Sequence, residues 1–408
     1  MKAFALSAIL FLATSSFAAN LTEPATTAIN SFGLDLLRSA ARPDTNALFS
    51  PYSMEFALAM TYAGADGVTR DEMAKTLHFG TNEMQVHRSF ALLRTQLDGM
   101  MQRSAKVAKE RNEKGNGAVT DPLTFVTANR VFGASGYPFR GGFMDCLRTN
   151  YQAPLLEVDF ARNPVAATKL INDMVWADTR LRIPNLIPPG ALNLETRLVL
   201  VNAVYLKAPW AEPFDAHSTR SAPFHLGVGA VADVPMMWKR ENVGYTKYNG
   251  FTAISIPYSG NELQFLILLP DATNGVQALE SRMIQLAACA NLPVREIILA
   301  LPKFKIAPPT LSLQPILKGL GMKTAFDARS ADFTRMARKG VYITGAFHKT
   351  FLNLDEKGTE AAAATAVAAG EGIEPKVMVI PVDHPFIFAI QHRASGACLF
   401  LGHVVDPR

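Results

Sequence analysis

Cysteine is scarce in this chain. Only Cys146, Cys289 and Cys398 occur among 408 residues, and they are widely spaced. Three scattered cysteines exclude both a disulfide framework and a cysteine-rich zinc site, so stability has to come from packing. One pair could still form a bridge in an oxidising compartment, but buried free thiols are the favoured interpretation. We expect no cofactor and no metal.

The sequence also lacks the motifs of the common catalytic classes. It contains no Gly-x-Ser-x-Gly elbow, no His-Glu-x-x-His pair and no P-loop. Four of the eight histidines, His348, His384, His392 and His403, lie in segments that we interpret as strands or turns. We therefore expect that the protein is not an enzyme.

Neither charge nor hydrophobicity is extreme. The 40 basic and 35 acidic side chains give a formal net charge of +5, a mild excess that by itself implies neither nucleic acid nor a membrane. Hydrophobic residues make up 49% of the chain, which is ample for a large buried core. We expect no nucleic-acid partner, no membrane partner and a monomer.

The first 19 residues have the pattern of a secretory signal peptide. Lys2 precedes an apolar stretch from Ala3 to Ala13, and a run of mostly small residues, Ser15 to Ala19, suits cleavage after Ala18 or Ala19. The alternative is a buried N-terminal helix. After this segment no apolar stretch is long and charge-free enough to cross a bilayer. We expect a secreted protein, extracellular or periplasmic, whose residues 20–408 form one domain.

Hydrophobic periodicity predicts a mixed α+β chain without a regular βα repeat. Helical patterns occupy the N-terminal third and recur twice later, at residues 22–40, 53–65, 69–77, 82–101, 165–176 and 310–320. Apolar, β-branched runs predict strands at 123–132, 198–206, 251–258, 263–269, 296–304, 377–380, 386–391 and 398–404. No repeat or Pro-rich linker divides the chain.

Two segments differ from this background. Residues 102–121 are polar and basic, so we interpret them as a flexible insertion; a polyanion is a possible ligand, although a solvated face is the favoured reading. Its basic side chains are Arg103, Lys106, Lys109, Arg111 and Lys114. Residues 358–372 consist almost entirely of Ala, Thr, Val, Gly and Glu.

The second of these segments has two interpretations. Its alanines from Ala361 to Ala369 favour a helix that ends at Gly370, because alanine leads the helix scale. Alternatively, the segment is a loop able to become a strand. Every second residue from Thr359 to Ala369 would then share one face, all are small, and the absence of proline keeps every backbone N–H available for a ladder.

Around this segment the sequence resembles the serpins, from about Leu21 to Asp406. The strongest matches are His348-Lys349-Thr350-Phe351 followed by residues 355–361, Asp-Glu-Lys-Gly-Thr-Glu-Ala. Other matches occur in the family's order, and their joint spacing makes chance an unsatisfactory explanation. They are Phe49-Ser50-Pro51-Tyr52-Ser53, residues 200–207 with Trp210 and Phe214, residues 234–237, 256–260, 301–304, 320–322 and 331–333, Asp383-His384-Pro385-Phe386 and residues 402–407.

The resemblance implies a serpin fold of three β-sheets and about nine helices, with an exposed reactive-centre loop at about residues 356–376. It also implies a metastable inhibitor of serine proteases that acts as a suicide substrate. The protease cleaves the loop and forms an acyl-enzyme, and the loop then inserts into the main sheet as a new strand, a mode of strand addition that is well known.

The resemblance assigns roles to three groups of residues. Glu356, Lys357, Gly358, Thr359, Glu360, Ala361, Ala362, Ala363 and Ala364 match the hinge of the loop. Ser50, Ser53, Asn202 and His348 match the buried polar cluster called the shutter, and Trp210 matches the breach, where insertion starts. The reactive bond falls near Gly372-Ile373, with Glu371 close by.

The resemblance is least informative about the target. Residues 370–372, Gly-Glu-Gly, offer no Arg, Met or Leu for a deep protease pocket. An elastase-like, subtilisin-like or Glu-preferring protease fits these residues better than a trypsin-like one. A non-inhibitory serpin that acts as a carrier or chaperone is the alternative function.

Overall fold

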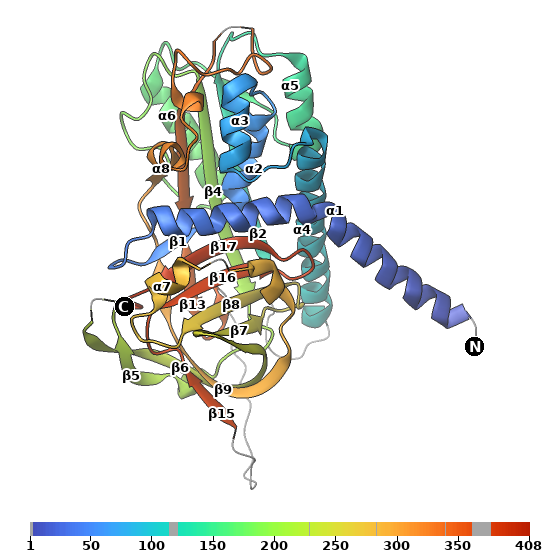
Figure 1. Ribbon diagram of the computed structural model, residues 1–408, viewed down its shortest axis with the longest axis vertical. Helices are drawn as coiled ribbons and strands as arrows, with labels where there is room; N and C mark the ends of the chain where they lie inside the picture. The colour runs from blue at the N-terminus through green and yellow to red at the C-terminus, as the bar shows by residue number, and fades with distance from the viewer. Residues whose placement is uncertain (1–2, 114–120, 228, 283, 339, 361–376) are drawn as a thin grey trace.

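The computed structural model describes residues 3–113, 121–227, 229–282, 284–338, 340–360 and 377–408 (Figure 1). The N-terminal part is helical, as the sequence predicts. Its helices are α1 Ala3–Ala40, α2 Pro51–Tyr62, α3 Gly67–Thr76 and α4 Glu83–Glu113. Shorter helices follow at α5 Gly141–Cys146, which continues as a π-helical turn at Leu147–Tyr151, α6 Pro164–Asp178, α7 Val276–Glu280 and α8 Leu313–Gly319.

Helix α2 is the central helix of the fold. The Ser50 side chain accepts a hydrogen bond from the Ser53 N–H, and Pro51 occupies the first turn, where a missing N–H costs nothing. Every residue from Pro51 to Tyr62 is buried, which explains why the helix carries no polar face. One consequence is that Ser53 and Glu55 are also buried polar residues.

The first of two hydrogen-bonded sheets has eight strands among the described residues. Strand β4, Leu198–Pro209, lies at its centre, with β2, Thr124–Ala134, antiparallel on one side and β12, Ile343–Thr350, parallel on the other. The remaining strands are β3 Leu156–Val158, β10 Phe304–Ile306, β11 Leu311–Ser312, β13 Leu352–Asp355 and β14 Gly358–Thr359.

The second network has nine strands and combines two of the three expected sheets. The 18-residue β6, Val231–Tyr248, joins them, because it pairs with β5 and β9 along its first part and with β7 along its last. The other strands are β1 Ala47–Phe49, β5 Arg220–His225, β7 Phe251–Pro257, β8 Leu263–Pro270, β9 Val294–Pro302, β15 Met378–Pro381, β16 Phe386–His392 and β17 Ala397–Val404.

A large apolar core joins helices α1 and α2 to both sheets, and a smaller cluster lies between α6 and the first sheet. The predicted α+β class is confirmed. All three cysteines are free; Cys289 and Cys398 are buried as expected, but Cys146 is partly exposed. Among the described residues, no helix combines the length and the apolarity that crossing a bilayer requires.

The interpretation of residues 102–121 as a flexible insertion is wrong for their first part. Helix α4 runs on to Glu113. Ion pairs at i,i+4, Lys106–Glu110 and Lys109–Glu113, support it, and Arg103 pairs with Glu262 elsewhere in the chain. Polar composition had suggested a loop, but these residue types are good helix formers. Residues 114–120, including Lys114, lie outside the described residues.

Candidate functional site

The segment that resembles the serpin hinge leaves the first sheet through a tight antiparallel turn. Strand β13 ends at Asp355, Glu356 and Lys357 form the turn, and β14 returns with Gly358 and Thr359. In β14, Thr359 pairs with Leu354 of β13 on one side and with Ala208 of β4 on the other. Gly358 and Thr359, two residues of the expected hinge, therefore lie as a short strand between β4 and β13.

Gly358 has to be glycine at this place. Its φ is +141°, a conformation that side-chain-bearing residues avoid, and a Cβ atom would lie 2.3 Å from the Ala208 carbonyl oxygen and 2.9 Å from the Trp210 nitrogen. The Trp210 N–H donates to the Lys357 carbonyl over 3.0 Å. The backbone of β4 thus approaches the turn closely enough to exclude any side chain at position 358.

Thr359 is hydrogen bonded to Tyr258, which in turn stacks on Trp210. Its hydroxyl lies 2.7 Å from the Tyr258 hydroxyl, and the Thr359 side chain is fully buried. The Tyr258 ring stacks on Trp210 with centroids 4.7 Å apart, and the Trp210 indole N–H donates to the Asp355 carbonyl over 3.0 Å. Burial raises the pKa of Tyr258, so its hydroxyl stays protonated and available as a donor.

Glu356 anchors the turn electrostatically. Its carboxylate accepts hydrogen bonds from Thr219 over 2.7 Å and from Lys303, whose ammonium lies 2.9 Å from the other oxygen. Burial acts to raise the pKa of Glu356, but these hydrogen bonds outweigh it and hold the pKa below its usual value. The carboxylate is therefore ionised and paired at neutral pH.

Glu360 is the last described residue of the hinge. Its carboxylate lies 2.9 Å from the Arg182 guanidinium, and its N–H donates to the Asn353 carbonyl over 2.9 Å. Burial raises the pKa of this carboxyl, against the effect of Arg182. The remaining hinge residues, Ala361, Ala362, Ala363 and Ala364, lie outside the described residues, as do Glu371, Gly372 and Ile373 of the expected reactive bond.

A second polar cluster lies under the middle of the same sheet. The structure brings Ser50, Ser53, Asn202 and His348 together, and each is at most 2% exposed. Asn202 of β4 is the direct register partner of His348 of β12, and their side chains are hydrogen bonded. The Asn202 amide also donates to the Ser53 hydroxyl of α2.

The hydrogen bonds of His348 fix its tautomer. The Ser50 backbone N–H donates to Nε2 over 3.2 Å, so Nε2 has to be unprotonated, and Nδ1 carries the hydrogen that is donated to the Asn202 side-chain oxygen. Burial lowers the pKa of His348 to about 3. The ring is therefore neutral at any physiological pH.

Sequence reasoning missed several members of these two clusters. Asn129 of β2 pairs in register with Asn202, and its side-chain oxygen accepts hydrogen bonds from Ser53 over 2.5 Å and from Asn202 over 2.6 Å. Tyr258 and Lys303 belong to the sequence segments that match the family, but the resemblance assigned no role to either residue. A single polar residue in a strand carries no local signal of its partner across the sheet.

Among the described residues, no three or more His, Cys, Asp or Glu side chains are grouped so that they could hold a metal ion. The turn that contains Gly358 lies at one end of the boundary where β4 meets β12 and β13. The buried polar cluster lies at the middle of that boundary. Such a boundary is a place where a further strand could be added to the sheet.

The comparisons with known proteins agree with this architecture. The family model described as serpin (serine protease inhibitor) matches residues 27–407, so the chain belongs to the serpin family. It is 34% identical to Serpin B6 of Pongo abelii, over 92% of this chain and 97% of that protein. It is 33% identical to the leukocyte elastase inhibitor of Homo sapiens, over 94% of this chain and the whole of that protein.

Solved structures confirm the predicted fold. The crystal structure of Serpin48 from the insect Tenebrio molitor covers 96% of this chain and 98% of its own at 28% identity, with a TM-score of 0.73. Uncleaved ovalbumin superposes with a TM-score of 0.77 at 24% identity and supports the fold alone. The description of the matched family is that of protease inhibitors, which agrees with the expectation that this chain is not an enzyme.

Proposed function

We propose that this serpin inhibits a serine protease as a suicide substrate. The protease serine attacks the carbonyl carbon of Gly372, the bond to Ile373 breaks, and the serine's proton passes to the Ile373 nitrogen, which leaves as a free amine. Gly372 stays on the serine as an ester. The chain from Thr359 onward then adds to the sheet between β4 and β12. The protease remains attached and its active site is distorted.

The observation that carries this proposal is the position of β14 between β4 and β13. Gly358 and Thr359 already hold the register that a longer strand would extend. Continuing that register on both sides places Thr365 between Asn202 and His348, on the same face as Thr359. The boundary to be opened is therefore the one that the Asn202–His348 hydrogen bond now closes.

The energy of such a step is sufficient. About ten new ladder hydrogen bonds at ~0.5–1.5 kcal/mol each would release on the order of 10 kcal/mol. That amount is comparable with the stability of a whole domain. Distortion of one protease active site is within this range.

The proposed target is an elastase-like protease, ahead of subtilisin-like and Glu-preferring ones. The small side chains of residues 370–372 favour a shallow pocket. Two similar proteins of 34% identity carry the name leukocyte elastase inhibitor, which supports the same class.

Incubation with a panel of elastase-, subtilisin-, trypsin- and Glu-specific proteases tests the function. Denaturing gels and intact mass would show a covalent adduct of chain and protease, together with a released peptide that begins at Ile373. Clean cleavage without adduct across the panel would contradict inhibition and support the carrier or chaperone alternative.

We also propose that residues 1–19 direct export and are removed. Helix α1 begins at Ala3, and in Figure 1 its N-terminal part projects beyond the rest of the molecule. Leu21 onward joins the packed body, since Thr22 and Ala25 are buried. N-terminal sequencing of the protein recovered outside the cell should start at Ala19 or Asn20; recovery of the full-length chain only inside the cell would contradict export.

We also propose a polyanion site on α4. Lys106 and Lys109 are 79% and 76% exposed, and their nearest carboxylates are 3.9 and 3.8 Å away, which leaves them accessible. Arg103 is tied to Glu262 at 2.6 Å. Binding of sulfated polysaccharide that weakens with salt and is lost on neutralising Lys106 and Lys109 would support the site; salt-independent binding would contradict it.

A further inference from the structure

A cavity among the described residues lies away from the segment that resembles the hinge, beside α3, α4 and α5. Its volume is about 860 Å³, within the range of pockets that hold small molecules. Five charged side chains line it: Arg140, Arg335, Arg338, Glu83 and Asp66. Nothing in the proposed inhibitory mechanism uses this cavity.

Two chain segments form its basic wall. An isolated antiparallel bridge joins Phe139 to Ala337, the Arg140 N–H donates to the Met336 carbonyl over 2.8 Å, and the Arg338 N–H donates to the Pro138 carbonyl over 3.2 Å. In such a pair, Arg140 and Arg338 are diagonal neighbours whose side chains leave the same face. Both residues line the cavity, so the bridge brings two arginines together at its wall.

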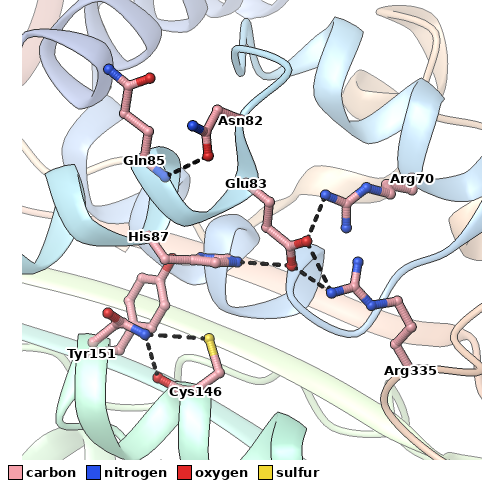
Figure 2. A network of polar contacts seen from close by, with 9 residues as sticks. Arg70, Asn82, Glu83, Gln85, His87, Cys146, Tyr151 and Arg335 are labelled. Atoms are coloured by element: carbon pink, nitrogen blue, oxygen red, sulfur yellow. Dashed lines mark hydrogen bonds and ion pairs between the residues drawn. The ribbon is translucent and has the colours of Figure 1, made fainter.

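The carboxylates of the cavity do not neutralise these two arginines. Glu83 is shared by Arg70 at 2.9 Å and Arg335 at 2.8 Å, and Figure 2 shows it between them. The Asp66 carboxylate accepts the Gly67 N–H at the start of α3. Arg140 and Arg338 have no carboxylate within ion-pair distance in the part of the chain that the structure describes.

The arginines around Glu83 also have N–H donors that the carboxylate does not use. Arg335 binds Glu83 through one terminal nitrogen only, and Arg70 keeps a buried nitrogen without an acceptor among the described residues. His87 completes the network at 3.4 Å from Glu83, and burial lowers its pKa, so it adds no charge at neutral pH. Three arginines and two carboxylates therefore line the cavity, and both carboxylates already have hydrogen-bond partners.

We propose that this cavity binds a small multivalent oxyanion, held between Arg140 and Arg338 and reached by the free donors of Arg335. A guanidinium group presents parallel N–H donors that match phosphate and carboxylate oxygens, which lysine does not. Compact anions that bear two or more such groups, as in pyrophosphate or citrate, share the required chemistry.

The cavity lies beside the ends of the two strands that flank β4, so a bound anion would affect how these strands separate. Strand β2 ends at Ala134, before Arg140, and β12 begins at Ile343, after Arg338; both of these strand ends lie beside Leu198 of β4. An anion shared by the two arginines would tie together the strands on either side of β4. If the proposed insertion mechanism holds, the bound anion slows the separation of β12 from β4; binding itself does not depend on that mechanism.

Isothermal titration of the mature chain with pyrophosphate and with citrate, at matched ionic strength, tests the site without any protease. We expect saturable one-to-one binding of at least one anion, weakened about tenfold or more in Arg140→Gln and Arg338→Gln, because each loses charge-assisted hydrogen bonds. Lys169→Gln removes one positive charge from the exposed face of α6 and is the matched control.

Each outcome decides the proposal. Preference for pyrophosphate or for citrate assigns the site to phosphate or carboxylate ligands. Absence of binding by both anions overturns it, and so does binding that is equal in wild type and Arg338→Gln. A loss of affinity as large in Lys169→Gln as in the two arginine variants would show general charge attraction and would also overturn it.

Discussion

Asn202 and His348 lie directly opposite each other on the parallel strands β4 and β12, joined by a hydrogen bond between their buried side chains. This pair closes the boundary at which the loop is proposed to insert. The two ring nitrogens of His348 have fixed donor and acceptor roles. Protonation of Nε2 would therefore break the hydrogen bond that it accepts from the Ser50 N–H.

The stability of the fold should fall in mild acid because of His348. Its pKa is about 3 in the folded chain, below the value of about 6.5 expected when unfolded. The unfolded state therefore binds the extra proton first, and the stabilisation present above pH 6.5 is lost as the pH falls toward 3. Linkage gives a loss of about 2 kcal/mol between pH 7.5 and pH 5.

Urea unfolding at several pH values, compared with His348→Asn, checks this effect. The variant should lack about 2 kcal/mol of the wild-type decrease between pH 7.5 and pH 5. His392 is also buried, with a pKa lowered to about 4, and it contributes equally to the pH dependence of both proteins. The difference between their two pH profiles therefore reports on His348 alone. Parallel pH profiles would show that His348 is not the titrating group.

Glu55 should destabilise the folded state at neutral pH. Its side chain is fully buried in α2, and neither carboxylate oxygen has a partner in the described part of the chain. Burial raises the pKa of Glu55 well above its usual value. The protein is therefore most stable below the pKa that Glu55 has in the unfolded chain, and it loses stability as the pH rises toward the pKa in the folded chain.

Replacement of Glu55 by methionine, which has a similar volume, should raise the free energy of unfolding at pH 7.5 by about 1–3 kcal/mol. Chemical denaturation measures the change. Glu195→Gln, at an exposed site, should be neutral. An unchanged or lowered stability in Glu55→Met would mean that the carboxyl has a stabilising partner that this account lacks.

Gly358→Ala should expel the short strand β14. The new methyl group would meet the backbone of Ala208 and Trp210, at a φ that alanine avoids. We expect a cost of about 1–3 kcal/mol and faster amide exchange at Thr359, measured by hydrogen exchange. Gly319→Ala, whose Cβ meets nothing within 4 Å, is the control. Unchanged exchange in Gly358→Ala would contradict the close approach seen here.

Thr359→Arg should convert the inhibitor into a substrate. Its side chain is buried against Tyr258, and an arginine there would have to bring an unpaired charge into the sheet. Cleavage of the loop should continue at the wild-type rate while the covalent adduct disappears from denaturing gels. Lys357→Arg, in the preceding turn, should keep the adduct. An adduct retained in Thr359→Arg would count against insertion.

Much of the fold could be predicted because its elements carry strong local patterns. Strand β4 is an apolar, β-branched run, and α2 has a serine cap and a proline in its first turn. Strand β6 was missed because its exposed and buried residues mix without a clean alternation. Helix α4 was ended too early because its last turns lack an apolar stripe and depend on ion pairs instead.

The candidate site was predictable only through resemblance. Ser50, Ser53, Asn202 and His348 are separated by up to 298 residues, and no periodicity links them. Strand register brings Asn129 into the same cluster, and register is a property of the folded sheet. The basic wall at Arg140 and Arg338 likewise depends on one isolated bridge between distant segments.

The most direct test of the central claim compares the wild type with Ala363→Pro and Ala363→Gly during incubation with an elastase. Proline removes a backbone donor that an inserted strand needs, whereas glycine keeps it. All three chains should be cleaved, and the wild type and Ala363→Gly should form an adduct that survives denaturation while Ala363→Pro should not. Equal adduct formation by Ala363→Pro would contradict loop insertion as the trapping step.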